Sequence, residues 1–280
     1  MVETTLAILN GILPLGYLLV LVAYLGVFVE HGQTVARVAT PLAWGVVVVH
    51  AAYLMTSAIT FGHVPTANTW ESLTFMAFAM ALVYLILEWR QGERSTGVFI
   101  MAVVLLFQTL SSAFVTHTRD VPEILKSSMF AVHVTAALMG YVALTVSAVY
   151  GIMYLLQYRQ LKNKRVGLLF QRLPNLETLS RLNIGALGFG WMALTVAIVA
   201  GAAWAMRLEV QGRLEGSFLT DPKFLMTFGL WVLYGLCLGG RYLLRWANRT
   251  LAAVSIVGFA LMLASSLTVA LVLRSFHDFG

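Results

Sequence analysis

Eight long hydrophobic segments, separated by short polar stretches, follow one another along the chain. Each holds about 20 residues, which is the length that a helix needs to cross the hydrocarbon core of a bilayer. In lipid every backbone group must be satisfied internally, which favours helices here. The pattern therefore predicts an all-α integral membrane protein, a bundle of about eight transmembrane helices in a single membrane domain, 1–280. We expect these helices over 5–29, 38–61, 70–88, 97–117, 127–157, 183–206, 224–244 and 251–273.

Composition agrees with this pattern and narrows the class of protein. The chain is 60% hydrophobic and 11% charged, with a mean hydropathy of +0.84, which excludes a soluble domain. Its net charge of +6 is explained by cationic loops that face anionic membrane lipid, so we expect lipid and no nucleic acid as a partner. The single cysteine, Cys237, excludes an intramolecular disulfide, and we expect it to be a small core residue.

The distribution of Lys and Arg between the loops predicts the orientation. The odd-numbered loops carry 12 of the 18 basic residues and the termini and even-numbered loops carry 6. The positive-inside rule then places the odd loops in the cytoplasm and both termini outside, N-out and C-out. The first segment lacks a basic n-region and a cleavage site, so we expect a retained span. The basic loop 159–181 is interpreted as the orientation signal; the alternative is an amphipathic helix on the leaflet.

The six histidines differ in their expected depth. His133 follows the start of the fifth segment by about a turn and a half, and His277 follows the last segment on the same, outer side. Two imidazoles at one level can ligate a haem iron from both faces and leave no open coordination position. For either histidine, the alternative is a residue that packs between helices. His50 lies midway along the second segment, whereas the remaining three are expected in loops: His31, His63 and His117.

The segment FGHVPTANTWESLTFMAF enters the third helix on the outer side. Asn68 or Thr69 can cap that helix, and Glu71 places a carboxylate in its first turn, where the helix dipole favours an anion. Capping is a sufficient explanation for Glu71. Trp70 beside it can be a residue of the interfacial aromatic belt, or part of an aromatic surface for a flat apolar ligand.

These segments resemble a known family of membrane proteins. GHVPTANTWESLTF is similar to the G-H-F-P-x-x-N-x-Y-E-S-L segment of the CcsA-type cytochrome c assembly proteins. FAVHVTAALMGYVALTVSAVYGIMYLLQY resembles the span that carries their first external haem histidine. TDPKF resembles the D-P-K that closes their tryptophan-rich segment, and LRSFHDFG resembles the end that supplies the second histidine. The order and spacing match over 50–280, and AVYGIMYLLQYRQLKNK is similar to the HemX branch.

The resemblance implies haem handling at the outer face. It implies external ligation by His133 and His277, and contact with haem or its presenting surface by Trp70, Glu71 and Asp221. The implied cofactor is a non-covalent, b-type haem. The implied partners are a cytochrome c assembly protein and apocytochrome c, and the implied location is a bacterial cytoplasmic (inner) membrane.

Two departures distinguish the chain from the assembly proteins. Where they have W-G-x-Y-W-x-W before D-P-K, this chain reads LEGSFLT over 214–220, with Phe218 as its only aromatic residue. Their intramembrane histidine falls on Gly239. His50 either replaces that ligand or packs against a neighbouring carbonyl. We therefore expect a haem carrier or chaperone rather than a complete cytochrome c synthase.

Three functions stay open at this point. The leading one is haem delivery for cytochrome c assembly, with haem held by His133 and His277. The alternative is a HemX-like membrane regulator of tetrapyrrole biosynthesis, which would use the basic loop 159–181 and transfer no haem. The third is a haem-b electron-transfer subunit, which needs ligand pairs at two depths, whereas only His50 is deep.

Overall fold

The computed structural model describes residues 2–30, 33–115, 127–164, 167–211 and 218–271. Every regular element within these ranges is helical, which confirms the all-α prediction. Eight helices are long and apolar enough to cross a membrane, as expected. The eight are α1 (Val2–Glu30), α2 (Gln33–Phe61), α3 (Thr69–Gln91), α4 (Gly97–Phe114), α5 (Ser128–Lys162), α7 (Leu176–Val210), α8 (Pro222–Leu243) and α9 (Asn248–Leu271). The described residues also form two short helices: α6 (Leu168–Arg172), between α5 and α7, and the 3-10 helix η2 (Phe218–Thr220), between α7 and α8.

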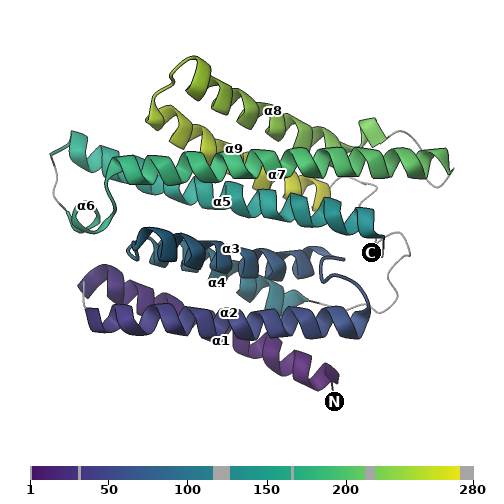
Figure 1. Ribbon diagram of the computed structural model, residues 1–280, viewed down its shortest axis with the longest axis horizontal. Coiled ribbons are helices and arrows are strands. Elements are labelled where there is room, and N and C mark those ends of the chain that lie inside the picture. The colour runs from purple at the N-terminus through teal and green to yellow at the C-terminus, as the bar shows by residue number, and fades with distance from the viewer. Residues whose placement is uncertain (1, 31–32, 116–126, 165–166, 212–217, 272–280) are drawn as a thin grey trace. The chain divides into compact units, whose positions relative to one another are not determined.

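The chain divides into two compact units. Unit 1 comprises residues 1–121 and 159–175 and contains α1 to α4 and α6. In it α1 packs against α2 and α4, and α3 packs against α2 and α4 (Figure 1). Buried tyrosines fill the centre of this unit, among them Tyr17, Tyr24 and Tyr84. Near the end at which α3 finishes, buried Glu88 accepts hydrogen bonds from the hydroxyls of Tyr24 and Thr40.

Unit 2 comprises residues 122–158 and 176–280 and contains most of α5 together with α7, η2, α8 and α9. Its core is a cluster of leucines around Tyr234 and Cys237. Cys237 is 1% exposed, which confirms that it is a small core residue. A polar contact joins three helices here, because the side-chain amide of Asn183 on α7 donates to Ser147 on α5 and to Ser255 on α9. Hydrogen bonds of this kind are the usual polar contacts between helices in lipid.

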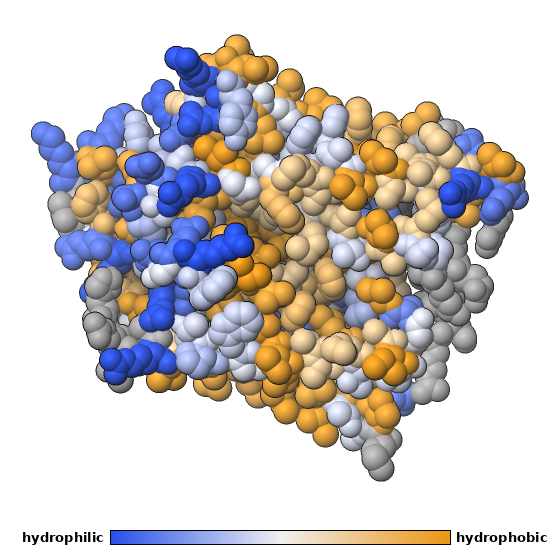
Figure 2. Space-filling model, in the orientation of Figure 1, coloured by the Kyte–Doolittle hydropathy of each residue, from blue (hydrophilic) through white to orange (hydrophobic). Residues whose placement is uncertain are grey.

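The surface is hydrophobic where a soluble protein would be charged. Many large apolar side chains are exposed along the helices of each unit, and hydrophobic residues cover much of the face drawn in Figure 2. Exposed apolar surface of this extent marks a surface that contacts lipid. The chain is a multi-pass membrane protein. Its orientation, N-out and C-out, stays a prediction.

The basic loop 159–181 is much shorter in the structure than in the sequence pattern. Helix α5 continues to Lys162 and α7 begins at Leu176, so both helices extend beyond the predicted spans. Between them α6 has five residues, little more than one helical turn. The guanidinium of Arg172 donates to the backbone carbonyl of Val29 over 2.8 Å, within unit 1.

Candidate functional site

His133 lies in the second turn of α5 and contacts the backbone of α7. Its Nδ1 is 2.8 Å from the carbonyl oxygen of Ala197. The ring reaches that backbone because position 201 is a glycine. A Cβ placed on Gly201 would lie 2.6 Å from Nδ1 and 2.7 Å from Cε1 of His133, too close for any real contact. The close approach of α5 and α7 at this level therefore depends on Gly201.

This hydrogen bond fixes the tautomer of the neutral imidazole. A carbonyl oxygen only accepts, so Nδ1 of His133 carries the proton and donates to Ala197. Nε2 then carries the lone pair. Histidines that bind metals almost always donate their other ring N–H to a carbonyl or carboxylate in this way, which sets the orientation of the ring and raises its basicity. The ring of His133 is thus held in the form that a metal ligand needs.

Stacked aromatic rings lie at the same level of unit 2. Trp231 on α8 stacks with Trp191 on α7 at a centroid distance of 5.5 Å, and with Phe228 at 5.6 Å. Phe224 continues the stack towards the start of α8 at 6.1 Å. We call these four residues the aromatic stack. Such offset ring pairs contribute beyond their buried area, and their faces suit a planar apolar ligand.

Hydrogen bonds fix the depth of the aromatic stack relative to His133. The indole N–H of Trp231 donates to the hydroxyl of Thr195 over 2.8 Å. Thr195 and Ala197 are two residues apart on α7, a rise of about 3 Å along the helix. His133 and Trp231 therefore contact α7 at nearly the same depth.

A second aromatic pair lies about one turn from this level. Phe130 on α5, one turn before His133, packs against Trp204 on α7, one turn after Gly201, at a centroid distance of 5.4 Å. Lys223, an exposed residue in the first turn of α8, is close enough to His133 for an electrostatic interaction. This end of unit 2 thus combines an oriented imidazole, aromatic faces and a cation.

Asp221 is the N-cap of α8. Its Oδ1 accepts hydrogen bonds from the backbone N–H groups of Lys223 at 2.9 Å and Phe224 at 3.0 Å, and Pro222 occupies the first helical position. Asp at the N-cap and Pro at N1 are favoured helix starts because they satisfy, or do not need, the free N–H groups of the first turn. The residues of the D-P-K motif therefore fix where α8, and with it the aromatic stack, begins.

Trp70 and Glu71 occupy the start of α3 in unit 1. Asn68 is the N-cap, its Oδ1 accepting from the N–H of Glu71 over 2.9 Å. The carboxylate of Glu71 is 1% exposed and accepts from the N–H of Ala67 over 2.9 Å, a variant of the capping box. Trp70 packs on Phe114 at 4.8 Å between centroids. Both residues thus shape the loop that enters α3.

His50 is fully buried in unit 1, at the centre of a hydrogen-bond network that crosses four helices. Its Nδ1 is 2.9 Å from the hydroxyl of Tyr17 on α1, and its Nε2 is 2.9 Å from the hydroxyl of Thr74 on α3. The network continues to Gln108 and Ser112 on α4 and returns to Asn10 on α1.

The direction of these bonds follows from the donors available. The hydroxyl proton of Thr74 goes to Oε1 of Gln108, over 2.8 Å, so Nε2 of His50 must donate to Thr74. Nδ1 of His50 then accepts from the hydroxyl of Tyr17. Both ring nitrogens are thus engaged, and ligation of iron by His50 would require one of these bonds to break.

The predicted site residues are distributed over both units. Trp70, Glu71 and His50 belong to unit 1, and His133 and Asp221 belong to unit 2. His277 lies outside the described residues, so its pairing with His133 stays a prediction. Within the described ranges, no group of three or more His, Cys, Asp or Glu side chains is placed to hold a metal ion.

The sequence alone did not single out the residues that support His133 or the hydrogen-bond network around His50. Gly201 is one of several small residues in AIVAGAAWA, and only the close approach of His133 distinguishes it. Trp231 and Trp191 read as ordinary hydrophobic positions. Gln108 and Asn183 could have been recognised in the sequence as interhelical hydrogen-bonding residues, because an amide inside an apolar span is costly unless it has a partner.

Comparison with known proteins agrees with the segments that resemble CcsA and HemX. A family model described as cytochrome c assembly protein matches residues 66–277. Protein HemX from Brevibacillus brevis is 28% identical over 261 residues, 91% of this chain and 92% of its own. Cytochrome c biogenesis protein CcsA from Microcystis aeruginosa is 28% identical over 269 residues, 78% and 80% of the two chains, and that from Guillardia theta is 25% identical over 248 residues, 81% and 80%. Because the matched region covers most of the chain, the protein belongs to the cytochrome c assembly protein family.

Proposed function

We propose that the protein binds a non-covalent, b-type haem at the outer face of a bacterial cytoplasmic membrane and delivers it for cytochrome c assembly. His133 and His277 are the proposed axial ligands. The observation that carries this proposal is the hydrogen bond from Nδ1 of His133 to Ala197, which presents Nε2 as the lone-pair donor.

The residues around His133 fit a haem. Two neutral imidazoles saturate the iron, so the bound group would supply no substrate activation and the protein would act by binding and release. The aromatic stack offers planar apolar faces at the level of His133, in a chain that lacks the tryptophan-rich stretch before D-P-K. Lys223 is a cation of the kind that a propionate needs.

The proposed role of Trp70, Glu71 and Asp221 is to shape the surface that presents haem, because they lie at the starts of α3 and α8. Asp221 sets the first turn of α8, from which Phe224 projects, and Glu71 holds the loop before α3. Their substitution is therefore expected to weaken haem binding less than substitution of His133. Apocytochrome c and an assembly partner are the proposed receivers of the haem.

The visible spectrum of the detergent-purified protein tests the ligand pair. Wild type loaded with haemin is expected to give a low-spin spectrum, because two imidazoles form a strong ligand field. His133→Ala and His277→Ala should each convert it to a high-spin spectrum, and added imidazole should restore the low-spin form by entering the vacated position. His31→Ala, outside both proposed ligand positions, is the control and should match wild type.

His133→Ala, compared with removal of two lysines from loop 159–181, separates haem delivery from regulation. If the protein is instead a HemX-like regulator that acts through loop 159–181, His133→Ala leaves its effect on tetrapyrrole synthesis intact, and removal of Lys162 and Lys164 abolishes it. A spectrum that neither histidine substitution alters contradicts the proposed ligation. Two haems per chain in a pyridine haemochrome assay would favour an electron-transfer subunit instead.

A further inference from the structure

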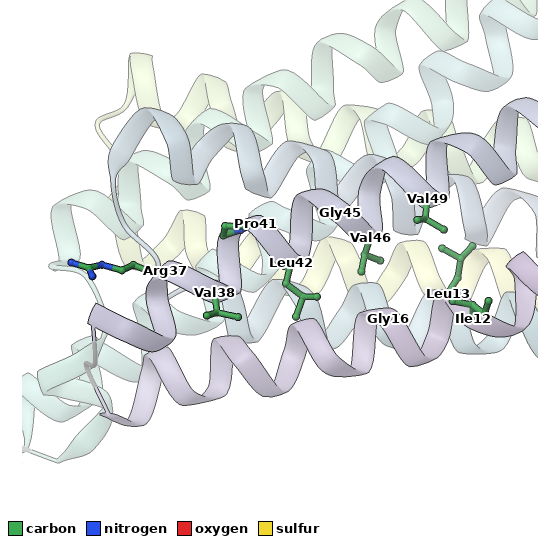
Figure 3. Close-up of a pocket in the computed structure, with 10 residues that line it drawn as sticks. All are labelled: Ile12, Leu13, Gly16, Arg37, Val38, Pro41, Leu42, Gly45, Val46 and Val49. Carbon is green, nitrogen blue, oxygen red and sulfur yellow. The ribbon is translucent and has the colours of Figure 1, made fainter.

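A groove of about 570 Å³ runs along the surface of unit 1 between α1 and α2 (Figure 3). Apart from Arg37, its lining is apolar. Two glycines, Gly16 and Gly45, are part of it. Gly45 has no atom within 4 Å of where a Cβ would lie, and Gly16 lies 3.1 Å by the same measure from a methyl group of Val46. Larger side chains at either glycine would fill the groove or separate the helices.

The groove has the length of one lipid leaflet. Its lining on α2 extends from Arg37 to Val49, twelve helical steps or about 18 Å of helix. The hydrocarbon core of a bilayer is about 30 Å thick, so a single leaflet contributes about 15 Å. An extended acyl chain therefore fits along the groove from the membrane surface to the midplane.

Arg37 gives one end of the groove a positive charge. Its side chain extends away from the apolar lining, past the other labelled residues in Figure 3. It is exposed and makes no hydrogen bond or ion pair with another described residue. Two other arginines of unit 1 are engaged, since Arg94 pairs with Glu88 at 3.3 Å and Arg172 donates to a carbonyl. The guanidinium of Arg37 thus has its donors available, and a phosphate accepts two of them in parallel.

We propose that this groove binds one anionic phospholipid, with an acyl chain along Gly16, Gly45 and Val46 and the phosphate on Arg37. The lining contains no histidine, cysteine, methionine or tyrosine, so it offers no axial ligand to a haem iron. No acidic residue lines the groove to repel the headgroup. Its lining shares no residue with the proposed haem site, whose two axial ligands belong to unit 2.

Photo-crosslinking of the full chain tests the proposal. The protein is reconstituted into phosphatidylcholine vesicles that contain a minor fraction of phosphatidylglycerol with a diazirine on its acyl chain, and the labelled peptides are identified by mass spectrometry. Labelling is expected to concentrate on the peptide that carries Gly45 and Val46. Arg37→Ala should reduce it about fivefold, the effect of removing one cation at the membrane surface.

Each test variant has a matched control. Gly45→Leu fills the groove and should abolish the concentrated label, whereas Gly11→Leu adds the same side chain to open space on α1, outside the groove, and should leave it unchanged. Arg90→Ala removes an exposed arginine of α3 and controls for charge.

Two results would overturn the proposal. One is label spread evenly over the exposed faces of α1 to α4, or unaffected by Arg37→Ala and Gly45→Leu, which would mean ordinary surrounding lipid. The other is loss of haemin binding in these two variants with unchanged lipid labelling, which would make haem the occupant.

Discussion

Replacement of Gly201 by alanine tests whether the close packing of α5 on α7 positions the proposed haem ligand. The added Cβ would lie 2.6 Å from Nδ1 of His133, so the ring must move by about 0.8 Å to reach an ordinary contact of 3.4 Å. Directed along the bond, that shift takes the distance from Nδ1 to the Ala197 oxygen from 2.8 Å past the 3.5 Å at which a hydrogen bond is lost. The imidazole then loses both its orientation and the fixed tautomer.

The expected effect on haem binding is larger than the effect on stability. Loss of a hydrogen bond to a metal-binding histidine lowers metal affinity by about 10- to 100-fold. The lost bond costs about 1 kcal/mol of stability, and the helix gains about 1 kcal/mol when glycine becomes alanine. The free energy of unfolding of Gly201→Ala should therefore stay close to that of wild type.

A matched control lies on the same helix. Gly188 on α7 has no atom within 4 Å of where a Cβ would lie, so Gly188→Ala adds the same methyl group without touching His133. Haemin titration of detergent-purified protein, followed at the Soret band, measures the affinity, and thermal unfolding measures the stability. Equal haemin affinity and equal spectra for Gly201→Ala and Gly188→Ala would refute the positioning role of Gly201.

Three further predictions concern the role of His50, the role of Asp221 and the pH dependence of haem binding. His50→Leu should lower the free energy of unfolding by about 1–2 kcal/mol, because Tyr17 and Thr74 lose their buried partner, and leave the Soret band unchanged; a weaker Soret band at full stability would make His50 a ligand. Asp221→Ala should cost about 1 kcal/mol as a lost N-cap while Asp221→Asn keeps the cap, and equal losses of haem affinity in both would show that the charge itself contacts haem. Haem occupancy should fall between about pH 7.5 and about pH 5, because a protonated imidazole cannot bind iron, and equal Soret intensity at both values would contradict histidine ligation.

The number of membrane-spanning helices was predictable because the thickness of the bilayer sets the length of each span. Apolar segments long enough to span it can be recognised without knowledge of their neighbours, and all eight were found. Their ends were less certain. Helices α5 and α7 extend past the apolar segments into basic and polar residues up to Lys162 and from Leu176, since a helix continues in water wherever no cap or proline ends it.

The roles of single polar residues were only partly predictable. Local hydrogen bonds were anticipated: Asn68 or Thr69 was expected to cap α3, and Asn68 does. Glu71 likewise bonds locally, to the backbone N–H of Ala67, whereas the partners of His50 come from other segments of the chain. Tyr17 is 33 residues from His50, and this separation carries no local pattern.

The sequence by itself determined that this chain is an eight-span, all-helical membrane protein of the cytochrome c assembly family, because span length, charge and family motifs are properties of neighbouring residues. Only the tertiary structure decided which nitrogen of His133 is committed to a carbonyl, that Gly201 leaves room for its ring, and that Trp231 lies at the same depth. Those facts depend on contacts between helices far apart in the chain, and in lipid such contacts are set by close packing and interhelical hydrogen bonds rather than by hydrophobicity.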